Sequence, residues 1–463
     1  MTDRRRFLQG AMLAGAAALA SFPAAADDDP WAMADKIVAR IKPPHFPPAA
    51  FPVTAFGAVG DGKTDCSEAF ARAVSACHLA GGGRVEVPVG DFLTGPIHLK
   101  SNVNLHLARG ATVRFSRDPK RYLPLVLTRW EGVELMNYSP LIYAFEQENV
   151  AVTGAGTLDG QADNEHWWSW KGKRDFGWKD GVPHQEDARK RLFQMGDDNV
   201  PVHQRLFGEG WNLRPGFFEP YRCKNVMIEG VNVKNMPFWE IHPVLCTNII
   251  VRGLTVDSIG PNTDGCDPES CTDVLIENCI FNTGDDCIAI KSGRNGDGRR
   301  VNVPSQYIVI RNCTMKNGHG AVTIGSEITG GVRWVFAENC RMSSPHLDHA
   351  LRFKDNAYRG GRLEHFYFRH IAIGEVAHAA LTIDFNYEEG ARGNYPASLT
   401  DVHVERLVCD HAGHAIDVEG LPNAKVADIT LTDCDFRRVD GPNIVKYVDG
   451  LKLKNVRING RRV

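Results

Sequence analysis

A short pattern of two strands separated by a polar break recurs along about half of the chain. From Asn225 onward, each copy begins with alternating apolar residues, changes direction at a polar residue and continues as a second short strand. Successive copies start 23 to 36 residues apart, a spacing typical of solenoids and other repeat folds. The copies read NVMIEGVNVKN, NIIVRGLTVDS, DVLIENCIFNT, YIVIRNCTMKN, WVFAENCRMSS, HFYFRHIAIGE, DVHVERLVCDH, DITLTDCDF and LKLKNVRING.

This pattern predicts a right-handed parallel β-helix. One unit is too small to bury its own apolar face, but a stack of units can do so. Helical periodicity is missing, the units lack the Leu-x-x-Leu-x-Leu of leucine-rich repeats, and they are too short for the four strands of a propeller blade. Earlier copies begin at Asn102 and Asn149. We therefore expect an all-β, single-stranded β-helix of about ten coils.

The first coil of a β-helix has unpaired strand edges that require a cover. The segment GDGKTDCSEAFARAVSACHLAGGG predicts a capping helix. Asp65 and Glu68 have the spacing of a capping pair, and Phe70, Val74 and Cys77 form an apolar stripe at helical spacing. The three glycines that follow are a helix stop signal.

Three cysteines, Cys279, Cys313 and Cys340, hold the same position in successive copies. We expect an interior stack of small apolar side chains rather than disulfides, for which sequence alone leaves the connectivity open. No CxxC pair or Cys/His cluster has the spacing of a zinc site. We expect neither a metal nor another cofactor.

The N-terminus has the features of an export signal. Paired arginines precede a Phe-Leu dipeptide, a short apolar stretch and a small-residue end, and the stretch is too short to span a bilayer. We expect a protein that works in the periplasm or outside the cell, with no membrane segment in its mature form. The expected organisation is a twin-arginine signal, a lead-in and a β-helical catalytic domain, at residues 1–26, 27–50 and 51–463.

One segment interrupts the repeat, from about residue 160 to about residue 217. It contains NEHWWSWKGKRDFGWKDG, which combines four tryptophans with several charges. A long loop within a compact fold is usually functional. We expect its tryptophans either to pack as a lobe or to stack on a sugar, and either arrangement would form a wall beside a binding site.

Acidic residues and a histidine fall at matching turns of successive predicted coils. Asp264 lies in GPNTDGCDPES, Asp285 and Asp286 lie one coil later in NTGDDCIAIKSG, and His319 follows in NGHGAVTIGSE. Stacked coils lie about 4.8 Å apart, so these side chains should meet on one face. An isolated Asp-Asp pair is more often a turn, but the set as a whole favours catalysis.

Adjacent carboxylates repel each other, which raises the pKa of one of them. One acid then holds a proton near neutral pH while its neighbours stay ionised. Glycosidic hydrolysis needs this division, because an acid protonates the leaving oxygen and a base activates water.

Two cations follow on the next coil. Arg352 and Lys354 are two residues apart in ALRFKDN, so they should project from the same face of a strand, where Arg352 can bind a sugar carboxylate bidentately. The net charge of −3 does not indicate a nucleic-acid partner. A polyanionic sugar would have to be bound by a local basic patch. Further cations on these coils are Lys291, Arg294, Arg299 and Arg300.

Four blocks carry a family resemblance. NTDGCD, GDDCIAIKSG, GHGAVTIGSE and RFK resemble the signatures of the polygalacturonase-type pectinases, glycoside hydrolase family 28. The resemblance extends over most of the chain from about Phe51, through FGAVGDGKTDCSEAF and GPIHLKSNVNLHL. The last block usually reads Arg-Ile-Lys, and Phe353, which replaces the isoleucine here, should face away from the site.

The resemblance implies hydrolysis of α-1,4 bonds between galacturonic acid residues in pectin, with inversion at the anomeric carbon. It assigns the general acid to Asp285, the activation of water to Asp264 and Asp286, and support of the acid's protonation state to His319. Inversion asks for an acid and a base roughly 6.5 to 9.5 Å apart.

For the substrate, the resemblance assigns carboxylate binding to Arg352 and Lys354, and Tyr387 in LTIDFNY matches an aromatic that stacks on the sugar after the scissile bond. Lys291 is a further expected substrate-binding residue. The insertion resembles those of exo-acting bacterial members, so we expect release of galacturonic acid, or of a short oligomer, from the non-reducing end.

Three alternatives stay open. A rhamnogalacturonan hydrolase would use the same acids on a different leaving-side sugar. A pectate lyase would bind calcium through carboxylates, and Asp264, Asp267, Asp285 and Asp286 are candidates for that role. A β-helical adhesin would bind polysaccharide without cleaving it, and would tolerate loss of Asp285.

Overall fold

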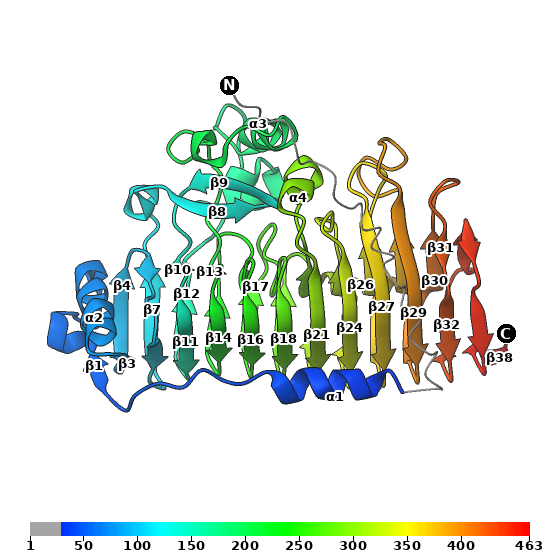
Figure 1. Ribbon diagram of the computed structural model, residues 1–463, viewed down its shortest axis with the longest axis horizontal. Coiled ribbons are helices and arrows are strands. Elements are labelled where there is room, and N and C mark those ends of the chain that lie inside the picture. The colour runs from blue at the N-terminus through cyan, green and yellow to red at the C-terminus, as the bar shows by residue number, and fades with distance from the viewer. Residues whose placement is uncertain (1–28) are drawn as a thin grey trace, which may run out of the picture.

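The computed structural model describes residues 29–463, and the predicted export signal at residues 1–26 lies outside the described residues. The strands stack side by side along one axis, each paired in parallel with the strand of the next coil (Figure 1). The predicted right-handed parallel β-helix is confirmed. The longest sheet has 15 strands, of which 13 follow one another along the stack, so the expectation of about ten coils was slightly low because the first coils carry no recognisable copy of the repeat.

Each coil contributes strands to up to three faces. The long sheet contains β1 (Ala50–Pro52), β3 (Gly83–Val87), β6 (Val103–Leu107), β11 (Glu148–Gly154), β14 (Lys224–Glu229), β16 (Thr247–Arg252), β18 (Thr272–Glu277), β21 (Ser305–Arg311), β24 (Val332–Glu338), β27 (Gly361–Arg369), β29 (Ala397–Glu405), β31 (Val426–Ala427), β32 (Ile429–Thr432), β35 (Val448–Asp449) and β36 (Lys452–Lys454). The second face contains β2 (Asp61–Asp65), β4 (Gly90–Thr94), β7 (Ala111–Phe115), β12 (Thr157–Asp159), β15 (Asn232–Lys234), β17 (Thr255–Ser258), β19 (Ile280–Thr283), β22 (Thr314–Met315), β25 (Arg341–Met342), β33 (Asp435–Phe436), β37 (Arg457–Ile458) and β38 (Arg461–Arg462).

The third face carries the site. It contains β5 (Ile97–His98), β10 (Ile142–Phe145), β13 (Phe218–Tyr221), β20 (Ile288–Ile290), β23 (Gly318–Ile324), β26 (Leu347–Lys354) and β34 (Ile444–Lys446), and the long strands β28 (Ala372–Asp384) and β30 (Val408–Glu419) run through both the second and the third face.

The polar break of the repeat is a turn residue in the left-handed conformation. Asn278, Asn312 and Asn339 have φ of 57°, 56° and 54°, a region that asparagine tolerates better than most residues. The cysteine that follows each of them faces the interior and is fully buried. All twelve cysteines of the chain are free, which confirms the predicted interior stack rather than disulfides.

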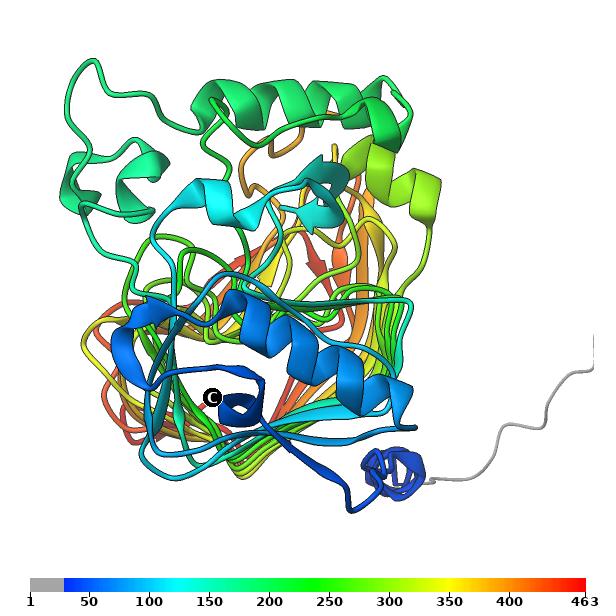
Figure 2. The same cartoon turned by 90° about the vertical axis from the view of Figure 1, so that its left-hand side faces the viewer.

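The predicted capping helix is present as α2 (Ser67–Leu79) and lies across the open end of the first coil (Figure 2). Its apolar stripe is buried as expected. The expected capping pair does not form: Asp65 accepts hydrogen bonds from the backbone and side chain of Ser67, while Glu68 pairs with Arg72 on the exposed face.

A second helix was not predicted. Helix α1 (Trp31–Arg40) lies outside the long sheet and runs along it (Figure 1). It buries Trp31, Ala34 and Ile37 on a stripe of outward-facing apolar side chains, one on each of seven coils. These side chains are Ala151, Met227, Ile250, Leu275, Val309, Phe336 and Tyr367.

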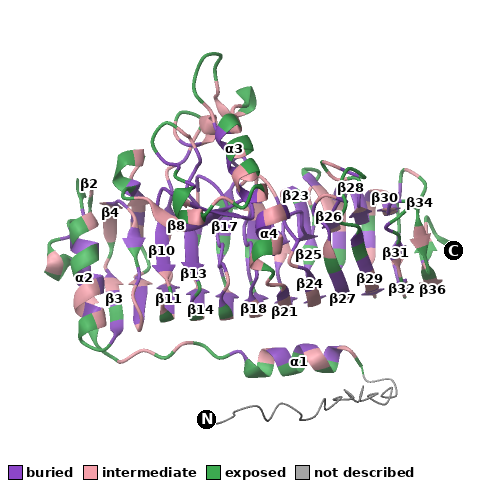
Figure 3. Ribbon diagram, turned by 45° about the horizontal axis from the view of Figure 1, so that its top comes forward, coloured by how far each residue is buried: buried purple, intermediate pink, exposed green. Residues whose placement is uncertain are grey.

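The insertion stands above the third face and contains α3 (Glu186–Asp197) (Figures 1 and 3). Beside it lie the antiparallel hairpin of β8 (Val126–Trp130) and β9 (Val133–Asn137) and the short helix α4 (Asn295–Val301). Trp167 is buried against Tyr122 and Trp170, with ring centroids 5.5 and 5.0 Å away. Trp168 and Trp170 pack against the same core, so three of the four tryptophans of this segment form a packed lobe, while Trp178 lies outside it beside His184.

Across residues 29–463, none of the helices has the length and apolar character needed to cross a membrane.

Candidate active site

The stacking register brings the predicted acids to one place on the third face. Cys266 pairs with Ile288, Ile288 pairs with Val322, and Val322 pairs with Leu351. Asp264 lies two residues before Cys266, and Asp286 lies two residues before Ile288. Their side chains therefore emerge from adjacent coils at the same level.

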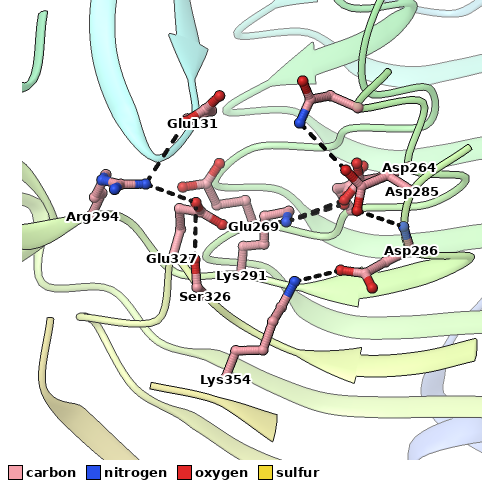
Figure 4. Close-up of polar contacts among 12 residues, drawn as sticks. Glu131, Asp264, Glu269, Asp285, Asp286, Lys291, Arg294, Ser326, Glu327 and Lys354 are labelled. Carbon is pink, nitrogen blue, oxygen red and sulfur yellow. Dashed lines mark hydrogen bonds and ion pairs between the residues drawn. The ribbon is translucent and has the colours of Figure 1, made fainter. Parts of the chain in front are cut away.

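Three carboxylates converge here. Asp264, Asp285 and Asp286 each place an oxygen within 4.8 Å of the others (Figure 4). His319 Nδ1 lies 3.1 Å from Asp285 Oδ1. The glycines beside His319 are required by close approach: a Cβ on Gly318 would lie 2.3 Å from the Asp285 carbonyl, and a Cβ on Gly320 would lie 2.8 Å from Asp286 Oδ1.

The two predicted cations lie on the opposite side of Asp286. Lys354 Nζ donates to Asp286 Oδ2 at 2.6 Å, and Arg352 lies 3.6 Å from Asp286 Oδ1. Phe353 between them is fully buried in the interior, as expected for a residue that faces away from the site. The Tyr387 ring lies against both cations, 5.3 Å from Lys354 Nζ and 5.8 Å from Arg352 Cζ.

Lys291 lies beneath the acids, and its ammonium is paired with carboxylates. Its Nζ is 3.4 Å from Asp264, 3.6 Å from Asp267 and 3.3 Å from Glu327, and it also lies 4.1 Å from the centre of the Trp239 ring. The side chain is 3% exposed and lines the floor of the pocket, where it neutralises the acids.

The protonation pattern follows from burial and these contacts. Burial, together with repulsion from Asp285, raises the pKa of Asp264 to about 8. Burial also opposes ionisation of Asp285, but the hydrogen bond and charge of His319 outweigh it and hold the pKa of Asp285 below its ordinary value. Asp285 in turn raises the pKa of His319 to about 9. One carboxyl pKa is raised as predicted, but that carboxyl is Asp264 and burial contributes more than repulsion, while the proton beside Asp285 is held by His319.

This pattern predicts the alkaline limb of the pH profile. Because Asp285 raises the pKa of His319 to about 9, the pair keeps its proton at neutral pH and loses it as the pH rises through that value. We expect kcat/KM, which reports groups of the free enzyme, to fall over this range. His319→Gln removes the imidazolium, so the limb should move at least about one pH unit lower. An alkaline limb that is the same in both proteins would contradict this assignment.

The acid cluster also has the composition of a cation site, since three carboxylate oxygens lie within reach of a single ion. Two of the three carboxylates, however, already have an ammonium partner: Lys291 beside Asp264 and Lys354 beside Asp286. These lysines supply the positive charge that calcium would supply in a lyase.

A cavity of about 220 Å³ opens above the acids. It is smaller than the roughly 300 Å³ at which pockets for drug-sized ligands begin, which suits one sugar unit rather than a length of chain. The coils supply its floor, including Asn262, Asp264 and Asp285, and the insertion supplies Lys171 and Arg189. Glu131, at the tip of the β8–β9 hairpin, completes one wall.

The wall is held by ion pairs that link distant segments. Arg189 Nε lies 2.7 Å from Glu131 and its guanidinium lies 3.4 Å from Glu388. Arg294 reaches Glu327 at 3.1 Å (Figure 4). It also lies 2.8 Å from Glu388. None of these wall contacts was predicted, because their partners come from the hairpin, the insertion and three separate coils.

The expected basic patch is only partly present. Arg294 belongs to the wall, Arg300 pairs with Glu134 and Asp297, and Arg299 stacks on the Tyr395 ring at 3.6 Å. These three arginines are therefore occupied by structural contacts, and the cations of the patch that lie beside the acids are Lys291, Arg352 and Lys354.

Sequence comparison agrees with this geometry. The model of the Glycosyl hydrolases family 28 matches residues 208–455, more than half of the chain. The chain belongs to glycosyl hydrolases family 28. All four signature blocks lie within the matched residues.

This family-28 chain is similar to several proteins named as polygalacturonases or exopolygalacturonases. A "Probable polygalacturonase" of Vitis vinifera is 29% identical over 82% of this chain and 72% of that protein, and an "Exo-poly-alpha-D-galacturonosidase" of Dickeya chrysanthemi is 24% identical over 90% and 75%. Among solved structures, a hyperthermoactive exopolygalacturonase from Thermotoga maritima is 46% identical and superimposes with a TM-score of 0.91, covering 93% of this chain and 96% of that one.

Proposed function

We propose that this family-28 hydrolase removes galacturonic acid units from the non-reducing end of polygalacturonate. The observation that carries the proposal is the small walled cavity directly above Asp285, lined by cations from the coils and from the insertion. An open groove would admit the middle of a chain, whereas this cavity has room for about one terminal sugar. Relatives described as exo-acting support the same conclusion.

In the proposed reaction, the proton held between His319 and Asp285 passes through the Asp285 carboxyl to the glycosidic oxygen. The bond from that oxygen to the anomeric carbon breaks while a water molecule forms a new bond to the same carbon. Asp286 takes the water's proton, Asp264 helps to orient that water, and Lys354 holds the Asp286 carboxylate in place at 2.6 Å. Arg352 and Tyr387 bind the sugar on the leaving side.

The stereochemical outcome is proposed from the family resemblance. The nearest oxygens of the three carboxylates lie within 4.8 Å, closer than the roughly 6.5–9.5 Å expected between the carboxyl groups of inverting enzymes. The separation therefore does not itself argue for inversion. We expect proton NMR of the first product to show the β-anomer, since the substrate linkage is α.

We further propose that residues 1–26 direct export and are removed, and that residues 51–463 act as one catalytic unit. The paired arginines and short apolar stretch support a twin-arginine route. Replacing both Arg4 and Arg5 by Lys should leave the protein in the cytoplasm of an expressing bacterium, and periplasmic protein at the original level would contradict that route.

The deciding experiment incubates the protein with galacturonic acid oligomers of three to eight units. We expect galacturonic acid from the first time point, one new reducing end per cleavage, no absorbance from a 4,5-double bond and the same rate in chelator. Unsaturated products that disappear in chelator would identify a lyase. Preferential cleavage of rhamnogalacturonan would identify the other hydrolase class, and mid-length early products would identify endo attack.

A further inference from the structure

The scissile bond of polygalacturonate joins two uronates, so a carboxylate lies on each side of the point of cleavage. Arg352 and Lys354 lie on coils that follow Asp285, together with Tyr387, and serve one of these carboxylates. The other carboxylate belongs to the terminal sugar in the walled cavity. To bind this second carboxylate, the cavity needs a cation on the other side of Asp285 that is not already paired with one of the acids.

Lys171 occupies this position. It ends a short 3-10 helix of the insertion, Trp168–Lys171, which is fixed to the coils because Trp168 Nε1 donates to the Met236 carbonyl at 3.0 Å. The Trp168 ring also lies directly over Gly260, where a Cβ would come within 2.2 Å of it. The backbone that carries Lys171 is therefore held against the β-helix.

The ammonium of Lys171 lines the cavity two hydrogen bonds away from the catalytic acid. Nζ donates to Asn262 Oδ1 at 2.8 Å, and Asn262 Nδ2 donates to Asp285 Oδ2 at 3.4 Å. Asn262 lies on the coil before Asp285, whereas Arg352 lies two coils after it. Lys171 and Arg352 thus approach the acid from opposite directions along the β-helix.

Lys171 differs from three other cations of the cavity in having no anionic partner. Lys173, which also lines the cavity, is exposed to solvent. Lys291, Lys354 and Arg189 each lie within 4.0 Å of at least one carboxylate, but within residues 29–463 no carboxylate lies that close to Lys171. Its one acceptor is a neutral amide, although an ammonium has three donors. Burial lowers the pKa of Lys171, and carboxylates farther away offset this effect only in part, so an incoming carboxylate would find a cation that has already lost much of its hydration.

We infer that Lys171 binds the carboxylate of the terminal galacturonic acid and makes the enzyme select a charged uronic acid over a neutral sugar at the non-reducing end. This inference rests on the proposed function, and it specifies the end group that the cavity accepts. A terminal galactose, or a terminal unit whose carboxyl is methyl-esterified, would leave the buried ammonium without its partner.

The test compares two trisaccharides with wild-type enzyme and Lys171→Met. One is trigalacturonic acid; the other has galactose as its non-reducing terminal unit and is otherwise identical. Lys171→Met should lower kcat/KM about 10- to 100-fold on trigalacturonic acid, the range expected for a charge-assisted hydrogen bond. It should change kcat/KM on the galactose-terminated trisaccharide less than about 3-fold. Where that trisaccharide is cleaved too slowly, its inhibition constant against trigalacturonic acid is measured instead and should not change.

Two variants control for structure and charge. Lys171→Arg keeps the cation and should recover part of the lost kcat/KM. Lys190→Met removes a lysine of the same insertion whose side chain is 70% exposed and paired only with Glu186, so it should behave as the wild type.

An equal loss of kcat/KM on both trisaccharides would mean that Lys171 only supports the wall. No loss on either would mean that Lys171 does not touch the sugar. Either result would overturn the inference, whereas the proposed function would still be supported if the wild-type enzyme cleaves trigalacturonic acid. Wild-type enzyme that releases no galacturonic acid from trigalacturonic acid would overturn the proposed function itself.

Discussion

Replacing Asp285 by Asn should lower kcat on trigalacturonic acid by at least about 10³-fold while the protein remains folded. The amide keeps the shape of the carboxyl and its contact with His319, but it can neither accept the proton that His319 holds nor pass one to the glycosidic oxygen. Because the substitution removes the charge attraction to His319 as well as the repulsion of Asp264, we expect an unfolding temperature close to that of the wild type.

Asp410→Asn is the matched control for this change. Asp410 is more than half exposed and pairs with Arg437 on the surface, remote from the cavity residues. It should retain wild-type kcat. Asp285→Asn enzyme that keeps more than about a tenth of wild-type kcat would exclude Asp285 as the general acid, since general acids contribute roughly 10²- to 10⁴-fold.

Replacing Arg214 by Met should destabilise the protein by about 3 kcal/mol and disturb the cavity at the same time. Arg214 is fully buried and joins the insertion to the coils. Its guanidinium donates to the carbonyls of Pro237 and Pro261 at 2.9 and 2.5 Å, to Asn262 Oδ1 at 2.8 Å and to Gln185 Oε1 at 3.1 Å. Methionine fills much of the same volume but leaves all four acceptors buried and without this donor.

The measurements are the free energy of unfolding in urea and kcat/KM on trigalacturonic acid. Asn262 also contacts Lys171 and Asp285, so its displacement should lower kcat/KM as well. Arg174→Met is the control, because Arg174 lies in the same insertion but is 73% exposed and pairs only with Asp180. Wild-type stability in Arg214→Met would show that the insertion does not depend on this contact.

The repeat made the fold predictable from the sequence because every coil has the same local arrangement of strands and turns. Alternating apolar residues enter the interior, and an asparagine such as Asn278 or Asn312 turns the chain in the left-handed conformation. A parallel β-helix pairs residue with matching residue in the next coil, so equivalent sequence positions become neighbours in space. For that reason Asp264, Asp286 and His319 were predictable as neighbours although 55 residues of sequence separate the first from the last.

Segments outside the repeat were not predictable in this way. Helix α1 covers an apolar stripe on the outer surface of the long sheet, and nothing in the sequence of residues 27–50 indicates which face it binds. The β8–β9 hairpin and the insertion carry Glu131, Arg189 and Lys171 to the cavity, but each has its own loop geometry and no counterpart in the next coil.

Amino-acid order alone thus specified the coils, the buried cysteines and the cluster of acids, since these depend on a register that repeats. Where the proton rests, which lysines are already neutralised and how the cavity is closed were decided only when the chain folded. Those properties depend on burial and on distances between side chains from unrelated segments, which no local pattern encodes.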